Sequence, residues 1–196
     1  MLNDFVLLHS FFKIQVEAAV FFVFFGLYIA IRVLFGGGES AWEKQKKIYS
    51  NGLELMRLRE WEAARDYFTL RNKKRPFESL PWVMLGEICL YQGENERAVF
   101  YAQKALRLDN TITEAHLLMS KGLKAMGEYN SAFQIARKAA WFGRKHAEAN
   151  RFLGLFYLEN GDVEKGIQHL ETAYSLGDED ASMALKSKNL KNKNWN

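Results

Sequence analysis

The chain has 196 residues, enough for one or two small structural units, and 48% of them are hydrophobic. Its net charge of +4 is accounted for by four lysines near the C-terminus, Lys186, Lys188, Lys191 and Lys193, so residues 1–180 are near neutral and give no nucleic-acid footprint. The single cysteine, Cys89, cannot form a disulfide within the chain, which excludes a disulfide scaffold and any need for an oxidising compartment.

Hydrophobic residues are concentrated in the N-terminal segment, residues 1–35. The stretch AAVFFVFFGLYIAI, from Ala18 to Ile31, has no charge, and its extension to Phe35 adds only Arg32 as a charged residue. A helix of that length spans about 27 Å, close to the thickness of the hydrocarbon core of a bilayer. Arg32 lies one turn from the end, where its side chain can reach the headgroups. The sequence therefore predicts one transmembrane helix at about residues 14–35.

Two other interpretations of this segment remain open. A cleaved signal peptide would use small residues such as Gly38 and Ser40, but the part before the apolar stretch carries Asp4 and no early positive cluster. A buried helix of a globular domain is the other interpretation, although the repeats described below form a complete fold that leaves no place for so many phenylalanines. We expect a retained single-pass anchor.

Positive residues flank the predicted transmembrane helix unequally. Lys13 precedes it, whereas four positive residues lie at its end or just beyond, namely Arg32, Lys44, Lys46 and Lys47. Since cytoplasmic flanks are enriched in Lys and Arg, we expect the rest of the chain to be cytoplasmic and the short N-terminus to lie on the other side of the membrane. Residues 36–44, which begin with GGG, are expected to form a flexible linker.

The sequence beyond the linker repeats itself at a fixed interval. The stretches 91–110, 125–144 and 159–178 align without gaps. Glycine fills one column of the alignment, at Gly93, Gly127 and Gly161, and small residues fill two more columns, at Ala98, Ala132 and Gly166 and at Ala105, Ala139 and Ala173. A fixed period on this scale indicates an array of stacked structural repeats.

Each repeat unit contains two blocks of helical periodicity, separated at the glycine column. Glycine suits the left-handed residue that closes a helix. In the second unit Ser79 suits the start of the first helix and Pro81 its first turn. Small residues also recur within the first block, at Gly52, Gly86, Ser120 and Gly154. The pattern predicts two antiparallel helices per unit that approach each other closely.

These residues resemble the tetratricopeptide repeat (TPR). In the second unit the resemblance rests on Trp82, Leu85, Gly86, Gly93, Ala98 and Ala105, preceded by Pro76; in the fourth it rests on Leu153, Gly154, Tyr157, Gly161, Ala173 and Leu176. We expect four units at 45–78, 79–112, 113–146 and 147–180, followed at 181–196 by the start of a capping helix and a basic tail. The resemblance implies an all-α fold, a right-handed α-solenoid. Departures from the family pattern are Arg59, Arg71, Ser120 and Gly166.

The sequence offers little catalytic chemistry. Its four histidines are scattered without metal-ligand spacing, and GGG is not part of a phosphate-binding loop. Cys89 falls beside Leu85 and Ile88, so a buried structural thiol is favoured over a reactive one. We therefore predict no catalytic, cofactor or metal site and no enzymatic activity. The basic cluster RNKKRP at 71–76 is either a solvated helix end or a contact for anionic lipid.

TPR arrays bind proteins or peptides in a concave face, so the resemblance implies an interaction module. Together with the anchor, it predicts a membrane-tethered adaptor, scaffold or assembly factor whose partners are subunits of a larger membrane complex. Two alternatives stay open: a constitutive structural subunit of such a complex, and a regulator that recruits a soluble enzyme to the membrane. The homo-oligomeric state is not predicted.

The resemblance also implies that the first helix of each unit lines the groove. In chain order the expected groove residues are Tyr49, Leu53 and Met56, then Val83, Met84, Glu87 and Leu90, then Leu117, Leu118, Lys121 and Lys124, and finally Arg151, Phe152, Leu155 and Leu158. This set is mostly apolar with two lysines, which favours an amphipathic partner helix with one or two acidic residues. The alternative is that several of these side chains only pack between neighbouring units.

Overall fold

The structure, a computed structural model, describes residues 20–27 and 40–187. The chain divides into two structural units, residues 1–41 and 42–196. Within the described residues all regular structure is helical and no strand occurs, which confirms the expected all-α class.

In the first structural unit, residues 20–27 are helical and expose a continuous apolar surface. The rings of Phe21 and Phe25, one turn apart, stack with centroids 6.0 Å from each other. Among the described residues no helix has both the length and the apolar character needed to cross a bilayer. Most of the predicted transmembrane helix, residues 14–19 and 28–35, lies outside the described residues, as do residues 1–13, most of the linker and the tail from residue 188.

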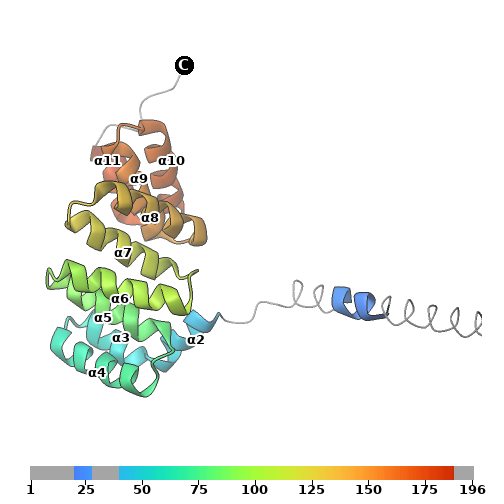
Figure 1. The fold of residues 1–196 in the computed structure, drawn as a ribbon. Helices are drawn as coiled ribbons and strands as arrows, with labels where there is room; N and C mark the ends of the chain where they lie inside the picture. The colour runs from blue at the N-terminus through green and yellow to red at the C-terminus, as the bar shows by residue number, and fades with distance from the viewer. Residues whose placement is uncertain (1–19, 28–39, 188–196) are drawn as a thin grey trace, which may run out of the picture. The chain divides into compact units, whose positions relative to one another are not determined.

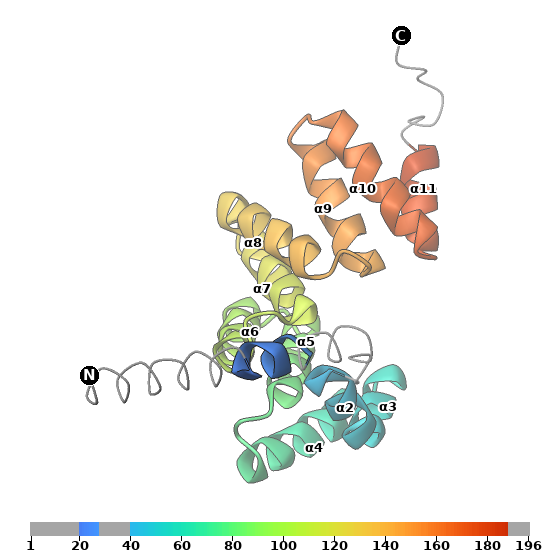
Figure 2. The ribbon, with the colours of Figure 1, turned by 90° about the vertical axis from the view of Figure 1, so that its right-hand side faces the viewer.

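The second structural unit is a stack of antiparallel helices (Figures 1 and 2). Its helices are α2 (Ala41–Ile48), α3 (Ser50–Arg57), α4 (Trp61–Lys74), α5 (Ser79–Tyr91), α6 (Asn95–Leu108), α7 (Thr113–Ala125), α8 (Tyr129–Phe142), α9 (Ala147–Glu159), α10 (Val163–Ser175) and α11 (Glu179–Ser187). The helices pair as α2/α3 with α4, α5 with α6, α7 with α8, and α9 with α10, and we call these pairs the first to fourth repeats. Helix α5 contacts α7, and α7 contacts α9, so first helices adjoin one another along the stack.

The first helix of the first repeat is bent into α2 and α3 at Tyr49. Helical hydrogen bonds continue through the bend, since the Tyr49 amide donates to Gln45 and the Leu53 amide donates to Tyr49. The Gln45 side chain in turn accepts a hydrogen bond of 2.8 Å from the amide of Leu80, one of the unpaired donors at the start of α5. Helix α2 is thereby fixed to the next repeat.

The glycine column closes the first helix of each repeat. Gly93, Gly127 and Gly161 have φ values of 79°, 82° and 82°, and in each case the next amide donates back to a carbonyl of the preceding helix. Arg59 occupies this column in the first repeat and is the one non-glycine residue with positive φ among the described residues, at 60°. The Glu60 amide makes the equivalent hydrogen bond to Leu55, 2.9 Å long. The turn is therefore the same, with a side chain where its geometry favours glycine.

Small residues allow the two helices of each repeat to touch. A Cβ atom added to Gly86 would lie 2.4 Å from Leu118 and 3.3 Å from the carbonyl oxygen of Ala98. In the fourth repeat a Cβ atom on Gly154 would lie 3.0 Å from the carbonyl oxygen of Gly166. The third repeat has Ser120 in this column, and its hydroxyl donates a 2.6 Å hydrogen bond to the Ala132 carbonyl of the facing helix. The serine is tolerated because the facing backbone satisfies its polar group.

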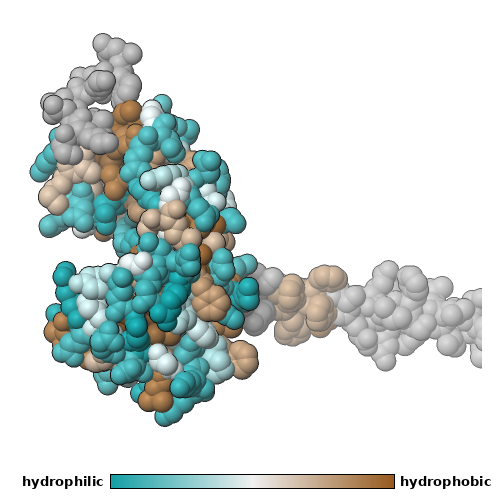
Figure 3. All heavy atoms as spheres, turned by 60° about the vertical axis from the view of Figure 1, so that its left-hand side comes forward, coloured by the Kyte–Doolittle hydropathy of each residue, from teal (hydrophilic) through white to brown (hydrophobic). Residues whose placement is uncertain are grey.

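The core runs between the two helix layers, and α11 covers its C-terminal end. Ala181 and Leu185 of α11 are fully buried against Leu170 and Ala173 of α10. The face seen in Figure 3 is mostly hydrophilic, with hydrophobic residues in narrow strips. The apolar face that each repeat would expose is therefore buried by the next element.

The strained turn at Arg59 yields a stability prediction. Replacing Arg59 with glycine relieves the cost of a left-handed conformation, which is about 1 kcal/mol for a residue with a Cβ atom, and should raise the free energy of unfolding by that amount. The same change at Arg57, which has helical geometry in α3, should instead lower it by about 1 kcal/mol. Chemical denaturation of both variants measures the difference, and a destabilising Arg59→Gly change would contradict the turn assignment.

Candidate functional site

A pocket of about 420 Å³ opens on the face formed by the first helices. Every repeat contributes to its lining, which consists of Met56 and Trp61 from the first repeat, Glu87, Leu90 and Tyr91 from α5, Glu114, Leu117, Leu118 and Lys121 from α7, and Glu148 from α9. We call it the inner pocket. Its position follows directly from the stacking of α3, α5, α7 and α9.

The apolar part of the inner pocket is formed where the first two repeats meet. The rings of Trp61 and Tyr91 stack with centroids 4.1 Å apart, so the start of α4 is joined to the end of α5. Leu117 and Leu118 are almost completely buried, whereas Leu90 is half-buried. The pocket thus offers a limited apolar surface beside an aromatic pair, which suits an apolar side chain of a partner.

The polar part of the pocket is dominated by carboxylates. Three glutamates line it, Glu87, Glu114 and Glu148, against one lysine, Lys121. The ammonium group of Lys121 lies 2.5 Å from Glu148, and the indole NH of Trp42 donates a 2.7 Å hydrogen bond to Glu114. Lys46, outside the lining, also lies 3.7 Å from Glu114. Glu87 has no such ion pair within the described residues, and the lining itself holds three carboxyl groups against one ammonium group.

The carboxyl group of Glu87 is perturbed by its surroundings. Burial is the main cause that raises the pKa of Glu87 to about 7, the charge of Lys121 opposes this shift, and the carboxylates of Glu148 and Glu114 add to it. A carboxyl group that is half protonated near neutral pH accommodates either a hydrogen-bond acceptor or a cation. A bound cation would favour the ionised form.

The structure distributes the expected groove residues over four environments. Those that line the inner pocket are Met56, Glu87, Leu90, Leu117, Leu118 and Lys121. Those buried in the core are Tyr49, Val83 and Met84, and those half-buried against neighbouring apolar residues are Leu53, Phe152, Leu155 and Leu158. The other two, Lys124 and Arg151, form ion pairs across helices.

Tyr49 and Val83 expose no surface, and Met84 exposes 6%, so these three side chains pack between helices and cannot touch a partner in this conformation. The Tyr49 hydroxyl donates to Glu78, and burial together with that contact raises its pKa to about 12. These three residues therefore follow the alternative interpretation, in which the side chains only pack between neighbouring units. Positions that face the groove and positions that face the core are adjacent on one helix. Whether the pocket residues contact a partner stays a prediction.

The expected charge of the partner needs correction. The prediction of acidic partner residues assumed that the charges of Lys121 and Lys124 are free to bind a partner. The structure pairs Lys121 with Glu148, and it pairs Lys124 with Glu159 at 2.8 Å. Each lysine reaches the first helix of the following repeat, so its charge is neutralised by a residue 27 or 35 positions further along the chain. The excess charge of the inner pocket is negative.

The sequence analysis did not include Glu114 or Glu148 among the expected groove residues, although both line the inner pocket. The repeat period contains the signal that relates them, since Glu148 follows Glu114 by one period. Trp61 and Tyr91 were also not predicted. They lie at the ends of adjacent helices and occupy different columns of the repeat alignment, so the repeat pattern does not relate them.

Features of catalytic sites are sparse in the described part of the chain. Among residues 20–27 and 40–187, no group of three or more His, Cys, Asp and Glu side chains is arranged to hold a metal ion. Cys89 is buried, and burial raises the pKa of its thiol, which agrees with a structural role. The expectation that the chain is not an enzyme stays a prediction.

Two parts of the chain match models of the tetratricopeptide repeat, residues 81–112 and residues 130–183. These segments are tetratricopeptide repeats. The matches cover the second and fourth repeats and the second helix of the third, and the first repeat departs from the family pattern at Arg59 and Arg71. Proteins with TPR arrays mediate protein–protein interactions and bind peptides. No curated protein sequence matches the chain.

Several solved structures, two of them described as TPR proteins, share the fold. TTC0263, a thermophilic TPR protein of Thermus thermophilus, is 19% identical with a TM-score of 0.61, over 68% of this chain and 74% of that one. Residues 41 to the end of MamA from Desulfovibrio magneticus RS-1 are 23% identical with a TM-score of 0.58, over 74% and 84%. YrrB, a TPR protein with an unusual peptide-binding site, is 21% identical with a TM-score of 0.55, over 71% and 72%. At these identities the likeness shows the fold alone, a TPR α-solenoid.

The perturbed carboxyl group of Glu87 predicts a pH dependence of stability. Between the ordinary pKa of 4.5 and the folded value of about 7, the unfolded chain has released this proton while the folded chain retains it. The free energy of unfolding therefore falls as the pH rises through that window, because the folded chain binds a proton that the unfolded chain does not. Glu87→Gln removes the titration, so the variant should gain stability relative to the wild type between pH 5 and pH 8.

Unfolding by urea at the two pH values measures that gain. Glu96→Gln, a change at an exposed glutamate in the first turn of α6, is the matched control and should show no comparable pH-dependent gain. An equal difference between Glu87→Gln and the wild type at both pH values would show that Glu87 titrates normally in the folded protein.

Proposed function

We propose that this protein is a membrane-tethered TPR adaptor or assembly factor that holds a helix or peptide of a partner protein on its inner face. The inner pocket carries the proposal, because it is the place where apolar, aromatic and charged side chains from all four repeats converge. A ligand that contacts several repeats at once gains affinity from surfaces that no single repeat offers.

The partner segment that fits best carries an apolar side chain next to a lysine or arginine. The apolar side chain would pack against Leu90 and the stacked rings of Trp61 and Tyr91. The cationic group would face Glu87, since Glu148 pairs with Lys121 and Glu114 pairs with Lys46. The similarity in fold to YrrB, a TPR protein with an unusual peptide-binding site, supports the use of such an array for peptide binding.

Tethering to a membrane is supported by the N-terminal sequence. The stretch from Ala18 to Phe35 contains a single charged residue, and the part that is described, residues 20–27, is helical with exposed Phe and Val side chains. The excess of lysines after this stretch supports a cytoplasmic position for the TPR array. An array held near the membrane would meet partners that are themselves subunits of a membrane complex.

The binding proposal predicts different effects for two equivalent ion pairs. Glu148→Gln removes a pocket carboxylate and should weaken retention of the co-purifying partner by about fivefold or more, since hydrogen bonds to charged groups contribute about 1.5–3 kcal/mol. Glu159→Gln breaks the corresponding pair with Lys124 outside the pocket and should leave partner retention unchanged.

Both variants are made in the full-length chain, and the partner is quantified by mass spectrometry after affinity purification under identical conditions. Thermal unfolding monitors stability, which should fall by a similar small amount in the two variants. Equal loss of partner from both variants would assign the effect to array stability and would contradict binding at the inner pocket.

The proposed topology predicts the accessibility of the segment after the apolar stretch. In a chain with Cys89 replaced by serine, a new cysteine at the exposed Ser40 should react with a membrane-impermeant thiol reagent only after cells are permeabilised. A cysteine in place of Asn3, on the other side of the predicted transmembrane helix, should react in intact cells. Strong labelling of the cysteine at position 40 in intact cells would contradict the cytoplasmic position.

A further inference from the structure

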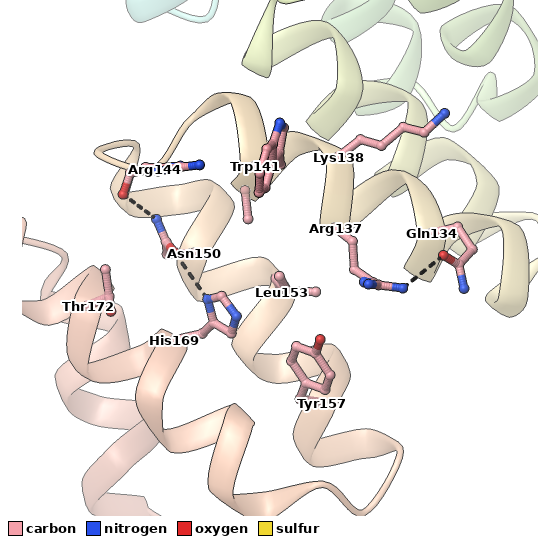
Figure 4. A pocket seen from close by; sticks show the side chains of 11 residues that line it. Gln134, Arg137, Lys138, Trp141, Arg144, Asn150, Leu153, Tyr157, His169 and Thr172 are labelled. Atoms are coloured by element: carbon pink, nitrogen blue, oxygen red, sulfur yellow. Dashed lines mark hydrogen bonds between the residues drawn. The ribbon is translucent and has the colours of Figure 1, made fainter.

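A second and larger cleft, of about 650 Å³, lies between α8, α9 and α10 (Figure 4). We call it the outer cleft. Its lining comes from Gln134, Arg137, Lys138, Ala140, Trp141 and Arg144 in α8 and the turn after it, Asn150, Leu153 and Tyr157 in α9, and His169 and Thr172 in α10. It shares no residue with the inner pocket, whose α9 contribution, Glu148, comes from another side of that helix.

The outer cleft is positively charged. Arg137, Lys138 and Arg144 line it, and none of the three forms an ion pair with any residue that the structure describes. The Arg137 guanidinium donates a 3.3 Å hydrogen bond to the neutral Gln134 side chain, and the Arg144 guanidinium lies 4.6 Å from the ring centroid of Trp141. No aspartate or glutamate belongs to the described lining. The cationic donors are therefore available to an anionic ligand.

An apolar surface accompanies these cations. The indole of Trp141 is 66% exposed at the edge of the cleft, although a side chain of this size is usually mostly buried. Leu153 and Ala140 form apolar parts of the lining, and both are buried. An exposed tryptophan next to arginines is the composition that contributes most to binding in protein–protein interfaces.

The polar floor of the cleft is fixed by buried hydrogen bonds. Asn150 is 4% exposed, and its amide nitrogen donates to the carbonyl oxygens of Arg144 and His146 at 3.1 and 3.0 Å. Its amide oxygen consequently faces the Nδ1 atom of His169, which donates to it at 3.1 Å (Figure 4). The His169 ring also stacks on Tyr157, with centroids 5.6 Å apart. Ligand binding therefore requires little ordering of the floor.

We propose that the outer cleft binds an acidic peptide segment of a partner protein, with an apolar side chain set between carboxylates. The carboxylates would pair with Arg137 and Arg144, which can each bind one in a bidentate manner, and with Lys138. The apolar side chain would pack against the exposed indole of Trp141. This site is independent of the inner pocket and takes a ligand of opposite charge, so one array would engage two different segments.

A protein segment fits this cleft better than a nucleic acid. Polyanion binding needs a basic surface that follows many phosphates, whereas residues 1–180 are near neutral as a whole and these three cations surround one hollow. The cleft also has the exposed indole of Trp141 at its edge, which a phosphate backbone would leave uncovered.

The test uses the full-length protein and a rhodamine-labelled octapeptide of Asp and Glu around one phenylalanine, with binding measured by fluorescence anisotropy. The double variant Arg137→Gln, Arg144→Gln should bind the peptide at least about tenfold more weakly, because two charged donors are lost. Trp141→Ala should also weaken binding. The double variant Lys73→Gln, Lys74→Gln loses the same charge at exposed positions of α4 and should bind as the wild type does.

Peptide controls separate chemistry from simple charge attraction. A peptide with lysine in place of each acidic residue should not compete, and an acidic peptide with serine in place of phenylalanine should bind more weakly. The proposal is overturned if the acidic peptide shows no saturable binding up to about 1 mM, or if the α8 variants bind it normally. It is also overturned if single-stranded oligothymidine or anionic vesicles bind more tightly than the peptide through the same arginines. Retention of the inner-pocket partner by the α8 variants shows that the two sites are separate.

Discussion

The structure depends on the close approach of the two helices within each repeat. Gly86 faces the Ala98 carbonyl oxygen, and Gly154 faces the Gly166 carbonyl oxygen, at distances that leave no room for larger side chains. This contact sets how closely the two helices of a pair pack, and the next repeat packs on the pair so formed. The placement of α3, α5, α7 and α9 along one face, and hence the inner pocket, depends on it.

The sequence predicts this framework well because its determinants are local and recur at a fixed spacing. A helix can close at Gly93 or pack at Ala98 in only a few ways. The same helix end and the same helix contact then recur in each repeat. Even the departures keep the geometry, since Arg59 adopts the left-handed turn and Ser120 satisfies its hydroxyl on the facing backbone. The bend at Tyr49 was not predicted, because it depends on how Gln45 meets the next repeat.

The candidate site was less predictable, because it depends on contacts between repeats. Val83 and Leu90 lie on the same helix two turns apart, yet one is core and the other lines the inner pocket. The charge of the site depends on ion pairs such as Lys121 with Glu148, which no column of the alignment displays. A one-dimensional pattern identifies the helix that carries a site, whereas the neighbouring repeat decides which of its side chains remain available.

The array emerges as a rigid support with two chemically different surfaces. The inner pocket combines carboxylates with an aromatic pair, and the outer cleft combines cations with an exposed tryptophan. Both lie across boundaries between helices of different repeats, so any loss of packing between repeats would alter both. With both sites occupied, such an array would hold two protein segments in a fixed relation to each other.

The most direct measurement of this account compares the free energies of unfolding of Ala98→Leu and Gln103→Leu, two leucine substitutions on α6. Ala98 is fully buried at the helix crossing, whereas Gln103 is exposed. Overpacking at Ala98 should lower the free energy of unfolding by about 1–3 kcal/mol, and Gln103→Leu should change it by less than about 0.5 kcal/mol. Equal effects at the two positions would contradict the close helix contact on which the array and its two surfaces are built.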